Sequence, residues 1–185
     1  MIVTELYNGQ GLGNQLWTYV VTRVIARDRG YGFGIKSPEK FKGGDFMNLD
    51  FGKPVVGGSG PEGGPPRALP QGITHYYAER SFIEPKTGSD IRTHDSRLTS
   101  IADNTQIDGL MQDENYILHR KDEIRQWLAV NKKDDCYDYS ADNICVINFR
   151  GGSYVRDADF FLPQSYWDNA IAHMKKINPA FKFIV

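Results

Sequence analysis

The fold is decided by the stretch that opens the chain, Ile2-Val3-Thr4-Glu5-Leu6-Tyr7 followed by Asn8-Gly9-Gln10-Gly11-Leu12-Gly13-Asn14. The first six residues form a short apolar run that predicts a strand, and the glycine-rich turn ends it. Apolar side chains then recur at helical spacing until Gly30, which is a typical helix stop. These side chains are Leu16, Trp17, Val20, Val21, Val24 and Ile25. A strand, a glycine turn and a helix in this order open an α/β unit.

Later segments continue the α/β pattern. Strands are predicted over 31–35 and 106–111, and the apolar spacing of 121–128 predicts a helix. The near-continuous apolar run 144–149 is typical of a buried parallel strand. A helix is expected to begin at Pro163, with one more strand over 181–185. The apolar face expected for this helix consists of Tyr166, Trp167, Ala170, Ile171, Met174 and Ile177.

The segment from Lys53 to Gly72 differs sharply in composition from the rest of the chain. It is rich in glycine and proline, which disfavour both a helix and a central strand. We expect an exposed loop there, either functional or without order of its own.

Composition excludes several classes of protein. The 185 residues include 22 Lys and Arg against 23 Asp and Glu, a formal net charge of −1, which argues against a nucleic-acid partner. No apolar run is long enough for a transmembrane segment, and the first residues do not resemble a signal peptide, so a cytoplasmic location is expected. Cys136 and Cys145 fit neither a disulfide framework nor a zinc site, and we interpret them as reduced structural thiols.

The glycine turn resembles a dinucleotide-binding fingerprint but does not match it. The pattern G-x-G-x-x-G requires glycine at Asn14 or at Leu16, and Lys36 stands where an acidic, ribose-binding residue is expected. Glycine backbone and free helix amides still suit anionic or hydroxyl oxygens, so Gly11 and Gly13 are candidate ligand-binding residues. The amides of Asn14 and Gln15 join them, because each both donates and accepts. Alternatively, the glycines serve only a tight turn and helix packing.

A second turn follows the run 144–149. It places Arg150 beyond the carboxyl end of a strand, where α/β proteins bind ligands, and a guanidinium can hold two phosphate oxygens. The alternative is a surface arginine paired with Asp157. Asp157 and Asp159 also form a D-x-D triplet, which could hold a divalent cation or simply complement the dipole of the following helix.

Three separated segments share their order and spacing with one known family. They are Gly9–Tyr19, Ile107–Tyr116 with Lys121–Arg125, and Val146–Val155 with Leu162–Ile171. They resemble the signatures G-G-L-G-N-Q-L-F-Q-Y, G-Y-x-Q-S-E-K-Y-F with K-x-x-I-R, and V-x-H-I-R-R-G-D-Y-V with L-x-x-x-Y-Y-x-x-A-I. These are signatures of the α-1,2-fucosyltransferases, glycosyltransferase family eleven.

The resemblance implies a GT-B type architecture of two Rossmann-like domains. Residues 1–142 would form the N-terminal, acceptor-side domain, and residues 143–185 the first β-α-β elements of the domain that binds the GDP-sugar. The implied reaction is transfer of fucose from GDP-fucose to a glycan hydroxyl with inversion, without a metal or another cofactor. Arg150 would hold the pyrophosphate, with Asn148, Ser153 and Tyr154 as further donor-binding residues. Asp157 is the candidate base, with Asp159 as the alternative.

The chain departs from the family pattern at three positions. Asn148 stands in place of histidine, Gly151 in place of the second arginine, and Ser153 in place of aspartate. The lost arginine removes a charge-assisted hydrogen bond, worth about 1.5–3 kcal/mol. The chain is therefore expected to be either a divergent transferase or a non-catalytic module that binds carbohydrate or nucleotide.

Overall fold

A computed structural model describes residues 1–61, 64–86, 90–131, 143–148 and 162–185. Its internal contacts divide the chain into two compact units, Met1–Asp134 and Asp135–Val185. The predicted domain boundary at residue 142 lies in the segment 132–142, outside the described residues. The two units are therefore described separately.

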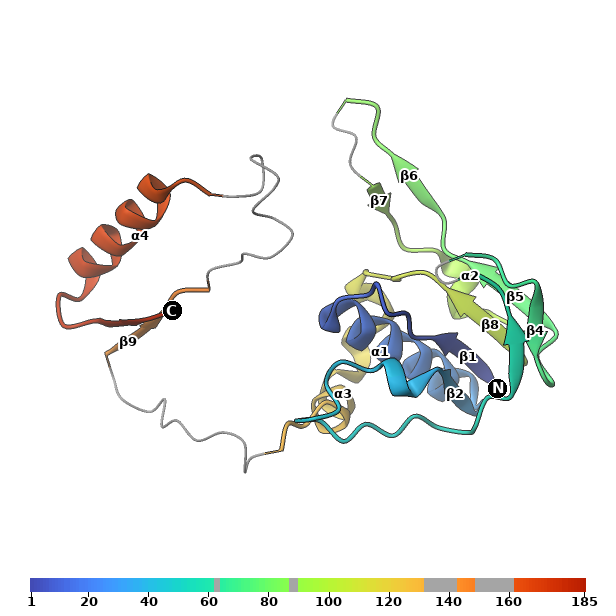
Figure 1. Ribbon diagram of the computed structural model, residues 1–185. Coiled ribbons are helices and arrows are strands. Elements are labelled where there is room, and N and C mark those ends of the chain that lie inside the picture. Colours follow the sequence, from blue (N-terminus) through green and yellow to red (C-terminus); the bar gives the residue numbers. More distant parts are fainter. Residues whose placement is uncertain (62–63, 87–89, 132–142, 149–161) are drawn as a thin grey trace. The chain divides into compact units, whose positions relative to one another are not determined.

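The first unit is built on a four-stranded parallel sheet (Figure 1). Its strands are β1 (Ile2–Glu5), β2 (Phe33–Lys36), β5 (His75–Ala78) and β8 (Thr105–Asp108), in the order β2-β1-β8-β5. All three pairings are parallel. The α/β class predicted from the sequence is confirmed, and this sheet is compatible with a Rossmann-like fold. The pattern had not indicated β5.

The strand order reverses between β1 and β8. The chain passes from β1 through α1 (Leu12–Arg29) to β2 on one side of β1, and it later enters β8 on the other side. At such a reversal, the connections that leave the carboxyl ends of two neighbouring strands run in opposite directions. α/β proteins bind ligands between these strand ends.

One face of the sheet packs against helices. Ile2 and Ile107 share a core cluster with Val21 and Ile25 of α1, because strand side chains alternate between faces while helical ones recur every three to four residues. The other short helices of this unit are η1 (Pro38–Lys40), α2 (Ser96–Thr99), η2 (Glu114–Tyr116), η3 (Leu118–Arg120) and α3 (Lys121–Trp127). The predicted helix 121–128 corresponds to α3.

The glycine- and proline-rich segment contains regular structure that its composition did not predict. β3 (Gly57–Ser59) and β4 (Ala68–Pro70) pair in antiparallel fashion, so the expectation of a loop without strands is wrong here. Gly57 and Gly58 have φ of 76° and 80°, a conformation open to glycine, and the hairpin lies outside the parallel sheet. A second hairpin consists of β6 (Ser81–Ile83) and β7 (Asp90–Arg92).

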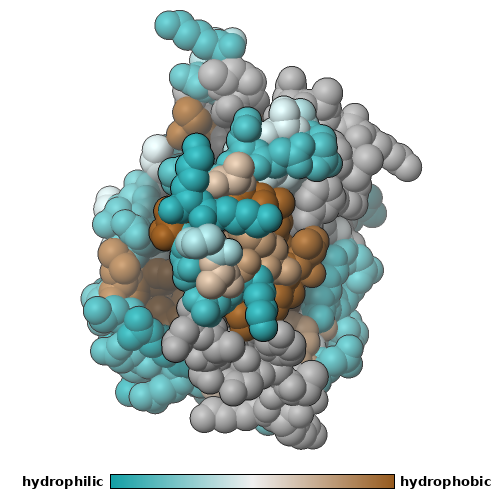
Figure 2. Space-filling model, turned by 90° about the vertical axis from the view of Figure 1, so that its left-hand side faces the viewer, coloured by the Kyte–Doolittle hydropathy of each residue, from teal (hydrophilic) through white to brown (hydrophobic). Residues whose placement is uncertain are grey.

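The second unit is one β-α-β element. β9 (Ile144–Val146) pairs in parallel with β10 (Lys182–Ile184), and α4 (Gln164–Ile177) connects them along the chain. The prediction that 144–149 forms a buried strand is wrong in two respects: the strand ends at Val146, and Val146 is 63% exposed. Residue 149 lies outside the described residues. Tyr166 and Ile177, from the predicted apolar helix face, are exposed as well. Figure 2 shows one face of the molecule, where apolar surface is visible among hydrophilic residues.

No helix in the described part of the chain combines the length and the apolar character that a bilayer span requires.

Gly30 provides a direct test of how α1 ends. It lies in the left-handed conformation with φ of 69°, and its N–H bonds to the carbonyl oxygens of Ala26 and Arg27. Gly30→Ala should lower the free energy of unfolding by about 1 kcal/mol, because a Cβ is disfavoured in this conformation. Urea denaturation measures the change, with the exposed Arg29→Ala as control. Equal stability of the two variants would contradict this account of the helix end.

Candidate functional site

The carboxyl ends of β1 and β8 bring together side chains from neighbouring strands. Alternation along β1 directs Ile2, Thr4 and Leu6 to one face of the sheet, and Glu5 and Tyr7 to the opposite face. By the same rule Asp108 leaves β8 on the face opposite Ile107. The candidate site lies on this second face, next to the strand-order reversal.

A row of polar side chains crosses the four strands there, and we call it the polar row. Its members, in strand order, are Lys36, Glu5, Tyr7, Asp108 and Tyr76. The Nζ atom of Lys36 lies 3.0 Å from Oε2 of Glu5. The Tyr7 hydroxyl donates to Oδ1 of Asp108 at 3.0 Å, and the Tyr76 hydroxyl donates to Oδ2 at 2.7 Å. Asp108 is thus held by one phenol on each oxygen.

Both tyrosines remain proton donors at neutral pH. Burial, followed by the nearby charge and hydrogen bond of Asp108, raises the pKa of Tyr7 well above its ordinary value. Burial and the bond to Asp108 raise the pKa of Tyr76 in the same direction. The phenol hydrogens therefore stay on the tyrosines and point to the carboxylate.

A cavity of about 230 Å³ opens beside Asp108. The residues that line it are Tyr7, Gln10, Arg92, Asp108, Gly109 and Leu110. One wall is fixed by Glu79, whose side chain is only 6% exposed: its Oε2 accepts from Nη1 of Arg92 at 2.6 Å and from the Leu110 amide at 2.8 Å. Gly109 has φ of 139°, and a Cβ there would collide with the Glu79 side chain, so this wall requires glycine.

The predicted ligand-binding glycines lie beside this cavity in sequence, immediately after Gln10. Gly11 caps the start of α1 without a side-chain hydrogen bond, and Gly13 lies in the first helical turn. A Cβ built at Gly9, Gly11 or Gly13 meets no heavy atom of the described structure within 4 Å, and none of the three has positive φ. Neither a strained turn nor close helix packing therefore explains glycine at these positions.

Asn14 and Gln15 differ in their surroundings. Asn14 is half-buried, and its Oδ1 accepts from Nε2 of Gln112 at 2.9 Å. Gln15 is fully buried: its Nε2 donates to the carbonyl oxygens of Lys40 (2.8 Å) and Tyr7 (3.4 Å), and its Oε1 accepts from the Lys42 amide (2.9 Å). Gln15 thus connects α1 to two loops. Its predicted contact with a ligand stays a prediction.

Most candidate residues of the second unit lie outside the part of the chain that the structure describes. Asn148 is exposed and follows β9 by two residues. Arg150, Ser153, Tyr154 and Asp157 lie outside the described residues, as do Gly151 and Asp159 of the same turn. The predictions for these positions rest on sequence.

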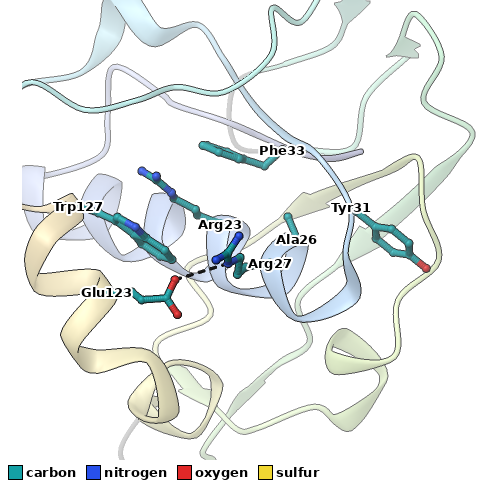
Figure 3. Close-up of a pocket in the computed structure, with 7 residues that line it drawn as sticks. All are labelled: Arg23, Ala26, Arg27, Tyr31, Phe33, Glu123 and Trp127. Atoms are coloured by element: carbon teal, nitrogen blue, oxygen red, sulfur yellow. Dashed lines mark ion pairs between the residues drawn. The ribbon is translucent and has the colours of Figure 1, made fainter.

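A second cavity, of about 340 Å³, lies along the last turns of α1 (Figure 3). Arg23 lies 4.3 Å from the ring centre of Trp127 and pairs with Asp50 at 3.5 Å, while Arg27 pairs with Glu123 at 3.6 Å. Each guanidinium thus faces a carboxylate, so the cavity carries little net charge. We interpret its arginines as packing residues between α1 and α3.

Sequence reasoning missed the carboxylate and tyrosines of the polar row. Tyr7 was detectable, because it stands at the carboxyl end of the strand predicted over 2–7, where ligand-binding residues gather. Asp108 was not, because the predicted strand ran from 106 to 111, whereas β8 ends at Asp108. Tyr76 was not, because no periodicity marked β5. Glu79 gave no signal, since its role depends on contacts with distant Arg92 and Leu110.

Comparisons with protein-family models, curated proteins and solved structures find no match. The resemblance to fucosyltransferases therefore rests on the three sequence segments alone.

Gln15→Leu tests the role of the buried amide. We expect the free energy of unfolding to fall by about 2 kcal/mol, because the Lys40 carbonyl and the Lys42 amide lose their partner without a replacement. Gln126→Leu, on the exposed surface of α3, is the matched control and should change stability little. Chemical denaturation of both variants gives the comparison, and a Gln15→Leu protein as stable as the control would refute the role assigned to this amide.

Proposed function

We propose that this chain is a fucosyltransferase-like glycosyltransferase, which transfers fucose from GDP-fucose to a sugar hydroxyl with inversion. The proposal includes a GT-B architecture in which residues 143–185 begin the donor-binding domain. Its partners would be a nucleotide sugar and a glycan acceptor. No metal or other cofactor is part of the proposed reaction.

The observation that carries the proposal is the glycine turn at the mouth of α1. Among the described residues, Gly9, Gly11 and Gly13 have no packing partner that demands glycine, and none of the three has positive φ. Glycine at such positions permits a ligand to approach the backbone, and the first amides of α1 lack a side-chain cap. The turn follows β1 directly, at the edge of the parallel sheet where α/β proteins bind ligands.

The proposed chemistry is a direct displacement at the anomeric carbon of fucose. The acceptor oxygen forms a bond to this carbon, the bond to the phosphate oxygen breaks, and GDP leaves with the electron pair. Arg150 would neutralise the charge that develops on the diphosphate, since an arginine fork binds two phosphate oxygens. Asp157 is the proposed acceptor of the hydroxyl proton.

A second candidate function is a non-catalytic module that binds carbohydrate or nucleotide. It is favoured by the residues at the second motif, where Asn148, Gly151 and Ser153 replace a titratable, a cationic and an acidic side chain. Such a module would bind glycan without turnover. Release of GDP from GDP-fucose that depends on an added sugar acceptor would exclude it.

Gly13→Ala separates a ligand role of the turn from a structural one. Alanine fits the helical backbone without a close contact, so stability should stay the same or rise by up to about 1 kcal/mol. Affinity for GDP-fucose should nevertheless fall about tenfold, because the methyl group holds a ligand away from the backbone. Calorimetry measures both quantities, with the exposed Gly44→Ala as control. Unchanged affinity would remove the observation on which the proposal rests.

Arg150→Ala tests the donor site. GDP affinity should fall by roughly tenfold or more, the equivalent of a lost charge-assisted hydrogen bond. Arg125→Ala, which removes an exposed arginine of α3, should leave GDP affinity unchanged. Equal heats of GDP binding in wild type and Arg150→Ala would reject the donor-site assignment.

A further inference from the structure

We infer that the cavity beside Asp108 binds a neutral sugar through the sugar's hydroxyl hydrogens, and that it does not take the diphosphate of a nucleotide. This inference rests on the proposed function for its biological meaning, since it assigns the cavity to the glycan acceptor. Its physical basis lies in the described residues of the first unit.

The hydrogen-bonding groups around Asp108 favour a ligand that donates hydrogen. The hydroxyl hydrogens of Tyr7 and Tyr76 are both directed to Asp108, so these phenols present only oxygen lone pairs to a ligand. The carboxylate of Asp108 likewise has only acceptor sites left. Tyr7 and Asp108, which both line the cavity, thus need a ligand that donates hydrogen, as a sugar hydroxyl does.

A phosphate group has the opposite property. Near neutral pH its oxygens act mainly as acceptors, and they would face the lone pairs of Asp108 and of the Tyr7 phenol without hydrogens between them. Such a contact leaves polar groups unpaired, which is costly in a partly buried site. The same acceptor surface therefore favours a polyol and disfavours a phosphate.

The charge of the cavity disfavours an anion. Arg92 is the cationic residue of the cavity wall, and its guanidinium pairs with the nearly buried carboxylate of Glu79 at 2.6 Å. With this pair neutral overall, Asp108 leaves the cavity with a net negative charge. An anionic ligand would be repelled at close range, while a neutral sugar would not.

The size of the cavity also favours a single sugar. The cavity measures about 230 Å³, below the roughly 300–1,000 Å³ of sites for drug-sized ligands. A single sugar ring suits this volume better than a complete nucleotide. Gln10 adds an amide to the same wall, and its Oε1 accepts from the Tyr7 backbone amide at 2.9 Å, which holds the side chain in place. Its Nε2 group can donate to a sugar oxygen.

The test measures saccharide and GDP binding separately on the full chain. A printed array of neutral oligosaccharides identifies a bound saccharide, and saturation-transfer NMR then follows its titration, while calorimetry follows GDP. Asp108→Asn should weaken saccharide binding by about tenfold or more, because the strongest acceptor of the cavity is lost. GDP affinity should not change. Asp122→Asn removes an exposed carboxylate elsewhere and should alter neither ligand.

Tyr7→Phe, which removes a phenol that lines the cavity, provides a second variant if Asp108→Asn fails to fold. It keeps the carboxylate and removes one phenol, so saccharide binding should weaken several-fold with GDP binding intact. Three results would overturn the inference: no neutral saccharide binds the wild-type protein, a folded variant of the cavity keeps full saccharide affinity, or GDP affinity falls in parallel. Saccharide binding that depends on Asp108, in a protein that neither binds GDP nor transfers fucose, would uphold the inference and reject the proposed enzyme.

Discussion

β1 hydrogen-bonds to a parallel strand on each side, and its side chains on both faces of the sheet are buried. Ile2 packs with α1, Val3 on the opposite face has no exposed surface, and Thr4 donates from Oγ1 to the carbonyl of Ile107 at 3.1 Å. A parallel strand in this position tolerates little change in register, because a shift by one residue would exchange its two faces. Both the glycine turn and the polar row depend on where this strand ends.

The two faces of the sheet carry different chemistry. The face toward α1 is apolar and supplies the core, whereas the polar row crosses the other face with an ion pair and a carboxylate held by two phenols. Polar groups on a half-buried face are stable only when they are hydrogen-bonded, and each member of the row has such a partner. The arrangement is therefore rigid without a ligand, which reduces the entropy lost when one binds.

Several elements could be predicted because their signals are local. Apolar periodicity, and glycines at the ends of elements, indicated the strand at residues 2–7, the helix that follows it and the strand near residue 106. β5 and the β3–β4 hairpin could not be found in this way: β5 is four residues long, and the hairpin depends on positive φ at Gly57 and Gly58 rather than on a pattern of apolar side chains. The site was predictable to the same extent. The glycines and Asn14 lie in one segment of the sequence. Tyr76 and Asp108 are 32 residues apart in the sequence and come together only in the folded sheet.

Gly109 and Glu79 limit which residues can stand at each other's positions during evolution. The backbone at Gly109 has φ of 139°, and Glu79 fills the space where its side chain would lie. Shortening residue 79 would not remove the collision, because the nearest atom is the Cβ of Glu79, and it would release Arg92 and the Leu110 amide. A substitution at one of these two positions is not compensated by a substitution at the other. During evolution the two residues can therefore change only together with their neighbours. Divergent copies of this chain would have to change the whole wall of the cavity together or keep it intact.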